Sequence, residues 1–484
     1  MISWIEKPDA FNDPDFRFLN VSHKFKDHRI DWDYADLGKL WNYNLNYMDY
    51  LLQKDLGKER GILLIQDFIK NISGKSPGLD SYPISLRGIN WIKFVTRHEI
   101  QNTEINRSLF AQYMILLHNL EYHLLGNHLL ENGFSLLYGA YYFCDQRFYK
   151  KAKEIILTEL KEQILADGGH FERSTMYHKI ILDRLLDCIN LLQNNERFSD
   201  QEILSAQMRS KGVLMVQWLN SMTFSNGQTP MLNDSTAGIA PSTEELNNYA
   251  ISLGLINEVL IGENPWHTNL KNSGYRRFNG LNFECIIDVG HIGPDYQPGH
   301  AHADTFNFVL CIQGKPVIVD VGVSTYEKNK RRQIERSTSS HNTVQINKHD
   351  SSEVWGGFRV ARRAKIIFLE EYQNIITARH DGYKHLDIIH ERSFSFSDNC
   401  LKTTDNIICK RQVHSTARLH MHPDVKFQKI GNTIFIDGLK IEFFGQDSIS
   451  IFDFMFAKQY NVLVPSKAIE ITFKGHLESV LTFD

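Results

Sequence analysis

The sequence predicts an α+β protein with a helical N-terminal domain over residues 1–265 and an antiparallel β-sheet domain over residues 270–484. Between about residues 40 and 260, apolar residues recur at helical spacing, and several segments are apolar on more than one face, as in helices packed in two layers. Beyond the breakers Pro265 and Gly274, alternating, β-branched segments follow one another without helical patterns between them. Such a succession favours an antiparallel sandwich.

The elements can be placed in order along the chain. Residues 1–40 are mixed and irregular, and the helical region begins at residues 40–51. Its period is clearest in Leu109, Tyr113, Leu116, Leu117 and Leu120. The second half contains strand patterns at residues 282–289, 315–320, 433–437 and 469–473. Because 484 residues exceed one ordinary core, two or three domains are expected.

The composition narrows the classes of function. The net charge is 53 − 57 = −4, so the chain lacks the overall basic field that favours nucleic acid, and we expect no nucleic-acid partner. The six cysteines form no Cys-x-x-Cys pair and are expected to be buried thiols. We find no signal-peptide core and no apolar run long enough for a bilayer. The expectation is a cytoplasmic protein without membrane insertion, or a periplasmic one if a leader was removed.

A short polar segment carries His300, His302 and Asp304 at alternate positions, just before an apolar run. In a strand these side chains would share a face, and two imidazoles with a carboxylate suit a metal site or proton transfer. With 21 histidines in the chain, a surface loop with chance spacing is the alternative. Two later strand patterns add a carboxylate at Asp320 and another histidine at His341, which favours a functional site.

Two places in the helical half also carry reactive side chains. Asn127, His128 and Glu131 would form one polar patch on a helix, although spacing alone favours a helix start with Asn127 as its N-cap. Further on, a Gly-Gly loop precedes a helix on which Arg173 and Tyr177 lie one turn apart. A cation at that distance can lower a tyrosine pKa from its usual value of about 10. The alternative is that Tyr177 packs between helices, as most tyrosines do.

Together these segments resemble the heparinase II/III-like polysaccharide lyases, a family that includes alginate and oligoalginate lyases. The resemblance covers most of the chain and is most specific at residues 299–304, 319–322 and 340–343. Weaker matches, in the same order as in the family, lie at residues 40–51, 82–91, 126–128, 171–178, 233–235 and 273–275. The resemblance implies an incomplete (α/α) toroid followed by antiparallel β-sheet layers. It also implies cleavage of a uronate-containing polysaccharide by β-elimination, which leaves unsaturated uronate ends.

The resemblance assigns four catalytic residues. Asn127 and His128 would hold the substrate carboxylate, while Tyr177 and His300 would transfer protons in a cleft between the two halves. We expect Tyr177 to protonate the leaving O4, with either His300 or Tyr177 as the base, according to the sugar epimer. Family members also bind a metal, usually zinc. One divalent ion with a mainly structural role is therefore expected, bound by His302, Asp320 and His341.

Other charged residues are predicted to contact the acidic polysaccharide or oligosaccharide: Arg87, Glu131, Arg173 and Arg336. Arg336 ends a basic segment, residues 328–336, which is expected to be a loop. That loop could attract a polyanion or simply be solvated, and the two interpretations carry equal weight.

Two other functions remain open from the sequence. One is a non-catalytic or accessory glycan-binding protein in capsule or exopolysaccharide biosynthesis. The other, less favoured, is a metal-dependent hydrolase, because such enzymes carry the His-x-His pair early in a parallel barrel. A homo-oligomer is compatible with either function and with the lyase.

Overall fold

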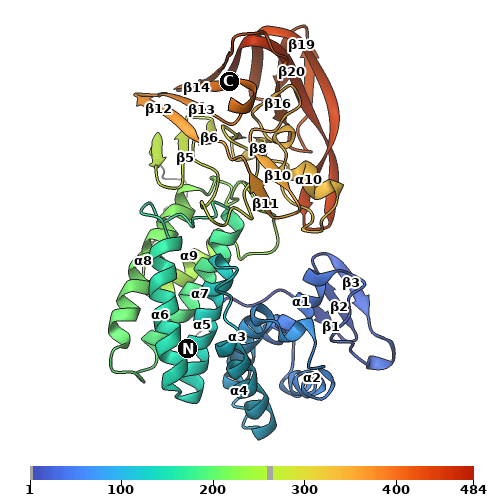
Figure 1. Cartoon of the computed structure of the whole chain (residues 1–484), viewed down its shortest axis with the longest axis vertical. Coiled ribbons are helices and arrows are strands. Elements are labelled where there is room, and N and C mark those ends of the chain that lie inside the picture. The colour runs from blue at the N-terminus through green and yellow to red at the C-terminus, as the bar shows by residue number, and fades with distance from the viewer. Residues whose placement is uncertain (1–3, 259–264, 484) are drawn as a thin grey trace. The chain divides into compact units, whose positions relative to one another are not determined.

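The computed structural model describes residues 4–258 and 265–483, and Figure 1 shows its helices and strands. Residues 1–3, 259–264 and 484, which include the start of the chain and part of the predicted domain boundary, lie outside the described residues. The N-terminal half is helical, as predicted: α1 Lys39–Tyr47, α2 Lys58–Asn71, α3 Ser81–Arg97, α4 Thr103–His118, α5 Gly126–Phe143, α6 Gln146–Gln163, α7 Thr175–Gln193, α8 Gln201–Ser221 and α9 Thr243–Ser252. No described helix is both long and apolar enough to cross a membrane.

Side chains at the helix ends and small residues inside the helices explain the helical packing. Asn102 and Asp145 accept hydrogen bonds from the first-turn amides of α4 and α6, as N-caps do. Gly88 on α3 and Gly139 on α5 lie against Tyr113 on α4, and a Cβ at either glycine would lie 2.7 Å from a Tyr113 atom. Helix α5 is buried along most of its length, which accounts for its being apolar on more than one face.

A small antiparallel sheet near the N-terminus differs from the expectation of irregular structure. It consists of β1 Phe11–Asn12, β2 Asp15–Phe18 and β3 Val21–Lys24, paired in that order. Phe16 and Phe18 are buried on one face and lie 5.4 and 6.0 Å, between ring centroids, from Tyr50. The alternation extends over only four residues, which is too short for a clear periodic signal.

The C-terminal half is antiparallel β structure, as predicted. One sheet has the order β4-β5-β6-β7-β8, with bounds β4 His267–Leu270, β5 Tyr275–Asn279, β6 Phe283–Asp288, β7 Phe308–Ile312 and β8 Lys315–Ile318. The larger sheet has the order β12-β13-β14-β15-β20-β19-β18-β17, and β16 pairs with β20 and β9. Its bounds are β9 Val344–Ile346, β12 Ile366–Tyr372, β13 Ile375–His380, β14 Ile389–Ser397, β15 Cys400–Ile408, β16 Ser415–His420, β17 Phe427–Ile430, β18 Thr433–Ile436, β19 Leu439–Gln459 and β20 Val462–Phe483.

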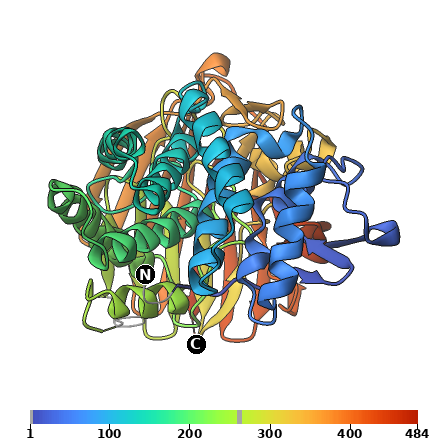
Figure 2. The same ribbon diagram turned by 90° about the horizontal axis from the view of Figure 1, so that it is seen from below.

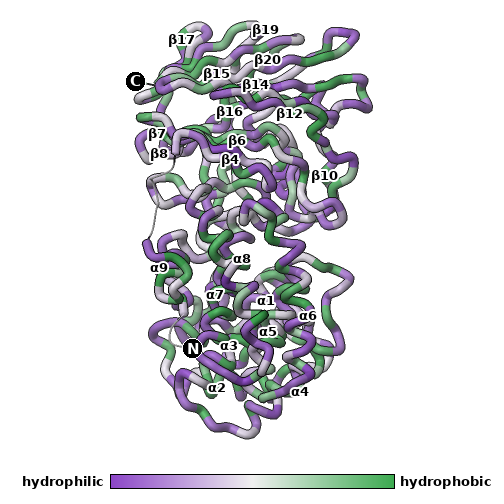
Figure 3. Tube along the Cα trace, turned by 90° about the vertical axis from the view of Figure 1, so that its left-hand side faces the viewer, coloured by the Kyte–Doolittle hydropathy of each residue, from purple (hydrophilic) through white to green (hydrophobic). Residues whose placement is uncertain are grey.

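The two large sheets share one hydrophobic core, so the predicted sandwich is confirmed. The rings of Phe278 on β5 and Phe396 on β14 stack with centroids 3.7 Å apart, and Phe283 and Phe483 stack at 4.2 Å. The colouring of Figure 3 shows hydrophobic residues interspersed with hydrophilic ones along these strands. The same half of the chain contains two further elements. They are a hairpin of β10 Glu353–Trp355 and β11 Arg359–Ala361, and the helix α10 Lys330–Arg336.

The compact units do not divide at one point of the chain. One unit comprises residues 1–164, 180–213 and 245–257, whose helices are seen from below in Figure 2, and the other comprises residues 165–179, 214–244 and 258–484. Two segments of the predicted helical domain thus belong to the β-sheet unit. One reason is that Trp218 donates a hydrogen bond from Nε1 to Ser273 Oγ at 2.9 Å. Tyr177 and His300 consequently lie in the same unit.

We predict that Gly274→Ala destabilises the protein by about 2 kcal/mol or more, because the new methyl group has no space. Gly274 has a φ of +93°, and a Cβ there would lie 2.3 Å from the backbone Cα of Gly290. The matched control is Gly227→Ala, where φ is +81° and no atom lies within 4 Å of the Cβ position. The control should lose only about 1 kcal/mol from the left-handed backbone. Urea unfolding measures both, and equal losses would contradict the close approach.

Candidate active site

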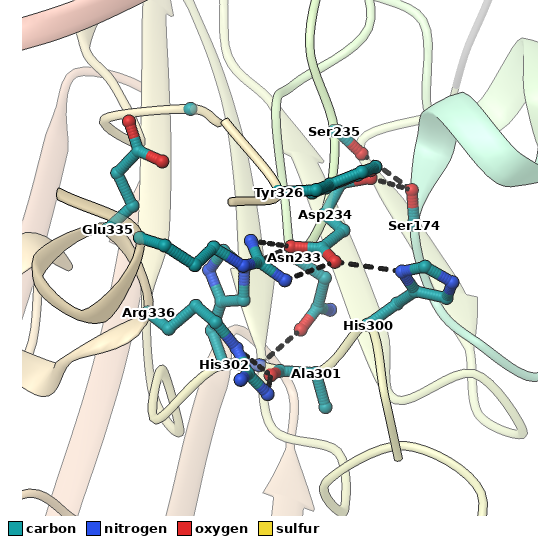
Figure 4. Close-up of polar contacts among 12 residues, drawn as sticks. Ser174, Asn233, Asp234, Ser235, His300, Ala301, His302, Tyr326, Glu335 and Arg336 are labelled. Atoms are coloured by element: carbon teal, nitrogen blue, oxygen red, sulfur yellow. Dashed lines mark hydrogen bonds and ion pairs between the residues drawn. The ribbon is translucent and has the colours of Figure 1, made fainter. Parts of the chain in front are cut away.

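One buried carboxylate, that of Asp234, lies at the centre of the candidate site (Figure 4). Its Oδ2 accepts a hydrogen bond from His300 Nδ1 at 2.8 Å, and its Oδ1 accepts one from His302 Nε2 at 2.8 Å. Arg332 donates to both oxygens, to Oδ1 at 2.5 Å and to Oδ2 at 2.6 Å. Burial alone would raise the pKa of Asp234, but Arg332 and the two histidines outweigh it and hold that pKa well below its usual range.

The two histidines lie in a loop, and the strand predicted from their alternation is therefore wrong. Strand β7 begins only after Phe306, whose left-handed φ of +69° breaks the alternation of faces. Side-chain and backbone hydrogen bonds fix the loop instead. Asp234 N–H donates to His300 O at 3.1 Å, and His302 N–H donates to Asn233 Oδ1 at 3.1 Å. Both imidazoles thereby reach one carboxylate without sharing a strand face.

Tyr177, in the first turn of α7, lies beside His300. Their ring centroids are 4.0 Å apart, and Tyr177 Oη donates to Tyr326 Oη at 3.3 Å. Burial raises the pKa of Tyr177 well above its usual value, and Tyr326 and Asp234 raise it further. The expectation that Arg173 lowers this pKa is therefore wrong, because desolvation dominates. Tyr177 is a protonated phenol at neutral pH and can donate a proton.

Tyr326 and Phe358 lie beside His300, and Arg332 shares Asp234 with it. The sequence singled out neither aromatic residue and placed Arg332 only in the basic segment. The Arg332 guanidinium lies over the rings of Tyr326 and Phe358, at 5.0 and 5.3 Å from their centroids. Phe358, between β10 and β11, is 42% exposed and meets His300 edge-on at 5.7 Å. The available signals were weak: Tyr326 follows the strand-end carboxylate Asp320 by six residues, and Arg332 is one of several basic residues. Asp234 stood within the resemblance at residues 233–235 but had no assigned role.

The basic segment forms helix α10 and is not a loop. Arg332 and Arg336 are both fully buried. Arg336 donates to Ala301 O at 2.9 Å and to Gly357 O at 2.7 Å, so it joins the histidine loop to the β10–β11 hairpin. Burial lowers the pKa of Arg336 to about 10. These contacts assign Arg336 to the support of the site, in place of the predicted substrate contact.

A pair of buried imidazoles offers two nitrogen atoms suited to a metal. The ring centroids of His302 and His341 are 5.3 Å apart, and His302 Nδ1 and His341 Nε2 are buried without a hydrogen-bond partner among the described residues. Asp320 accepts from the other nitrogen of His341, Nδ1, at 2.8 Å and from Asn307 Nδ2 at 2.7 Å. Two of the three predicted ligands therefore present donor atoms. In the described part of the chain, no three His, Cys, Asp or Glu side chains are grouped closely enough to hold an ion.

Arg173 keeps unused hydrogen-bond donors close to the site. Its φ is +58°, and its carbonyl oxygen accepts from Tyr275 Oη at 2.8 Å. Its Nε and Nη1 atoms are buried without a hydrogen-bond partner in the described structure. The buried carboxyls of Asp288 and Asp304 interact electrostatically with this guanidinium, which lowers their pKa values. Burial outweighs this effect and raises the pKa of Asp288 to about 8 and that of Asp304 to about 6. Free guanidinium donors are what the predicted anion-binding role of Arg173 requires.

Asn127 and His128 lie in the first turn of α5, within the helical unit. The helix begins one residue earlier, so Asn127 is inside the helix and is not its N-cap. Asn127 is 4% exposed, whereas the side chain of His128 is 34% exposed. His128 Nδ1 is hydrogen-bonded to Glu121 Oε1 at 3.1 Å, and its ring lies 4.4 Å from the ring of Tyr82. Glu121 thus fixes one ring nitrogen, and Nε2 has no hydrogen-bond partner among the described residues.

Two predicted substrate contacts, Arg87 and Glu131, lie in the interior of the helical unit. Arg87 donates to Gln112 Oε1 at 2.7 Å and to Asn46 O at 2.8 Å, and burial lowers its pKa to about 9. Glu131 faces Arg184, with 3.4 Å between Oε2 and Nε, and burial raises its pKa to about 6. Both side chains have no exposed surface, so a sugar does not reach them in this structure. We assign both to the framework of the helical unit.

Comparisons with known proteins identify the family. Residues 90–252 match the family described as heparinase II/III N-terminus, and residues 264–480 match the one described as heparinase II/III-like, C-terminal. The chain belongs to the heparinase II/III-like family. Solved structures with the same fold include heparinase III and a heparan sulfate lyase. Heparinase III has a TM-score of 0.76 at 16% identity over 95% of this chain and 80% of its own. A heparan sulfate lyase from Pedobacter heparinus has a TM-score of 0.66 at 18% identity over 97% and 81%.

Two curated relatives of this heparinase II/III-like chain carry the name heparin-sulfate lyase. The protein from Pedobacter heparinus is 25% identical over 302 residues, which are 56% of this chain and 42% of that protein. The protein from Bacteroides stercoris is 23% identical over 318 residues, which are 60% of this chain and 45% of that protein. The chain therefore spans less than half the length of these two relatives.

We predict that His178 makes the stability of the protein fall in acid. His178 donates from Nε2 to Met215 O at 3.0 Å and accepts from His170 N–H at 3.3 Å, and burial lowers its pKa to about 3. Below pH 6.5, the unfolded chain therefore binds a proton that the folded chain does not. This one group should lower the free energy of unfolding by about 1.4 kcal/mol per pH unit between pH 6.5 and 3.

The measurement is urea unfolding of the wild type and of His178→Gln at pH 7.5, 6 and 5. The variant should lose stability at neutral pH but show a shallower pH dependence, by about one proton. His118→Gln, at an exposed histidine, is the control for the loss of an imidazole as such. A wild-type slope in the His178 variant would show that the buried imidazole is not the group responsible.

Proposed function

We propose that this chain is a polysaccharide lyase that cleaves a uronic-acid-containing polysaccharide by β-elimination. The observation that carries the proposal is the pairing of Tyr177 with His300, ring against ring at 4.0 Å, with Asp234 behind the histidine. A proton donor and a proton acceptor side by side are what the elimination requires. Two relatives are named heparin-sulfate lyases, and these names support an acidic glycan as the substrate.

The reaction would break the C4–O4 bond of the glycosidic linkage without consuming water. A base removes the proton on C5, beside the uronate carboxylate. The electron pair forms the C4=C5 double bond, and the leaving O4 receives a proton. Negative charge develops on the carboxylate during this change, so donors aimed at it stabilise the transition state more than the ground state.

The surroundings of Tyr177 and His300 suit separate roles. The pKa of Tyr177 is raised by burial, so its hydroxyl carries a proton to give to O4. His300 is held through Nδ1 by Asp234, so its Nε2 is the ring nitrogen that can take the C5 proton. Tyr326, bonded to the Tyr177 hydroxyl at 3.3 Å, can return a proton to it after transfer. For the opposite C5 epimer, Tyr177 would have to lose its own proton before acting as the base, which its raised pKa disfavours.

The proposal keeps Asn127 and His128 as the pair that binds the uronate carboxylate. His128 presents Nε2 because Glu121 occupies Nδ1. Arg173 would add a contact to a carboxylate or sulfate through its unused donors. Because two relatives are named heparin-sulfate lyases, heparan sulfate is the first polymer to try, followed by chondroitin and alginate. A panel of such polymers, followed by the ultraviolet absorbance of the unsaturated uronate, tests the proposal; no absorbance from any of them would count against it.

We further propose that His302 and His341 hold one divalent metal ion, with zinc as the expected metal. Imidazole nitrogens are ordinary zinc ligands, and Asp320 would orient His341 through its Nδ1, as carboxylates do for zinc-bound histidines. When bound, the ion supplies a cross-link between the histidine loop and the segment after α10. The role is structural, and no proton transfer depends on it.

We predict that Tyr177→Phe lowers kcat by about 10²–10⁴-fold, because it removes the proton donor and leaves the ring in place. Asn127→Ala should lower kcat by about 10²–10³-fold through the loss of a carboxylate donor. The control is Tyr383→Phe, which removes another buried hydroxyl of the β-sheet unit, one that donates to Val344 O at 2.7 Å and not to Tyr177 or Tyr326. The control should keep near-normal kcat. If Tyr177→Phe kept near-normal activity on the polymer that the wild type cleaves, Tyr177 would not be the proton donor.

We also predict that the purified protein contains about one equivalent of a divalent metal by elemental analysis. His302→Ala and His341→Ala should lose both the metal and several degrees of thermal stability. His390→Ala is the control, because His390 is equally buried but both its ring nitrogens are hydrogen-bonded, to His380 and Asp405. It should lose stability and keep the metal. A metal-free wild-type protein, even after loading with zinc, would contradict the proposed site.

A further inference from the structure

We propose that Asp234 is a positioning residue that fixes His300 and His302 in opposite tautomers. It would hold the proton of His300 on Nδ1, so that Nε2 faces the substrate, and the proton of His302 on Nε2, so that Nδ1 is free. The role at His300 rests on the proposed lyase function, whereas the tautomers themselves do not depend on it.

The hydrogen-bond inventory of Asp234 requires this arrangement. Arg332 has only donors and occupies both carboxylate oxygens, at 2.5 and 2.6 Å. An ionised carboxylate has only acceptors, so each histidine nitrogen that faces it must carry hydrogen. These nitrogens are Nδ1 of His300 and Nε2 of His302, each at 2.8 Å. One side chain thus determines both tautomers, and the unpartnered Nδ1 of His302 is the expected consequence.

The backbone of Asp234 also ties the two proposed proton-transfer groups together. Its N–H donates to His300 O at 3.1 Å, and its carbonyl oxygen accepts from Ser174 Oγ at 2.7 Å. Ser174 Oγ in turn accepts from the N–H of Tyr177 at 3.2 Å. The next residue, Ser235, accepts from Met176 N–H at 3.3 Å. Asp234 therefore connects the first turn of α7 to the histidine loop through short links on both sides, some of which are visible in Figure 4.

The chain contains a matched control for the loss of this carboxylate. Asp405 is equally buried and accepts from His390 Nε2 at 2.7 Å. It also accepts from Arg392, at 2.7 Å from Nε and 2.8 Å from Nη2. Asp405 thus has the same kinds of partner, a histidine and a two-pronged arginine, but its histidine has no assigned part in the reaction. Comparing the two carboxylates separates positioning from stability.

The experiment compares Asp234→Asn with Asp405→Asn in the full-length protein, on whichever uronate polymer the wild type cleaves. An asparagine at 234 turns one acceptor into a donor, so one histidine or Arg332 loses its partner. We expect kcat per folded molecule to fall by about 10²–10⁴-fold in Asp234→Asn, with KM changed less than about threefold. Asp405→Asn should lose comparable thermal stability and keep kcat within about threefold of the wild type.

Ring-nitrogen NMR of ¹⁵N-histidine-labelled wild-type protein supplies a readout that does not require activity. With the signals assigned through His300→Gln and His302→Gln, His300 should show hydrogen on Nδ1 and His302 hydrogen on Nε2. The opposite assignment for His300 would overturn the proposal even if Asp234→Asn failed to fold. Equal kcat in Asp234→Asn and Asp405→Asn would also overturn it. A wild type that releases no unsaturated product refutes the lyase function alone, since the NMR result still decides the tautomers.

Discussion

The ion pair between Asp234 and Arg332 is the interaction on which the candidate site depends. Both side chains are fully buried, and removal of one partner of such a pair typically costs about 3–5 kcal/mol, because the other charge is left without compensation. In this site Arg332 supplies two donors and the two histidines supply the others. The carboxylate is consequently saturated, and its neighbours have little freedom to move. Side-chain hydrogen bonds thereby fix a loop that has no regular backbone ladder.

Buried arginines recur as the supports of irregular segments in the β-sheet unit. Arg336 joins the histidine loop to the β10–β11 hairpin through Ala301 and Gly357. Arg392, on β14, donates from Nη1 to Phe306 O at 2.9 Å and to Asn342 O at 2.8 Å. Their forked donors can satisfy several carbonyl groups that no ladder reaches. The sandwich thus supplies the strands, and buried arginine side chains hold the segments between them.

Much of the fold could be predicted from the sequence, because helices and strands leave different apolar periods over long segments. The site was predicted in part: the resemblance pointed to Tyr177 and His300, which do lie together. Asp234 could not be assigned from local sequence, since its partners lie 66 to 98 residues away. The left-handed φ of Phe306 has no sequence signature, so the alternation predicts a strand where the structure has a loop. Burial explains two further differences between expectation and structure. It raises the pKa of Tyr177, which Arg173 was expected to lower, and it encloses Arg87 and Glu131, which were expected to contact the substrate.

Elimination and hydrolysis of a glycosidic bond differ by one water in the mass balance of their products, and this difference tests the proposed reaction. A uronate oligosaccharide of defined length is incubated with the protein, and the masses of both product fragments are measured by mass spectrometry. If the chain is a lyase, the fragment masses add up to the mass of the substrate, and the unsaturated fragment is lighter by one water than its saturated counterpart. Fragments whose masses sum to the substrate plus one water would show hydrolysis instead of elimination.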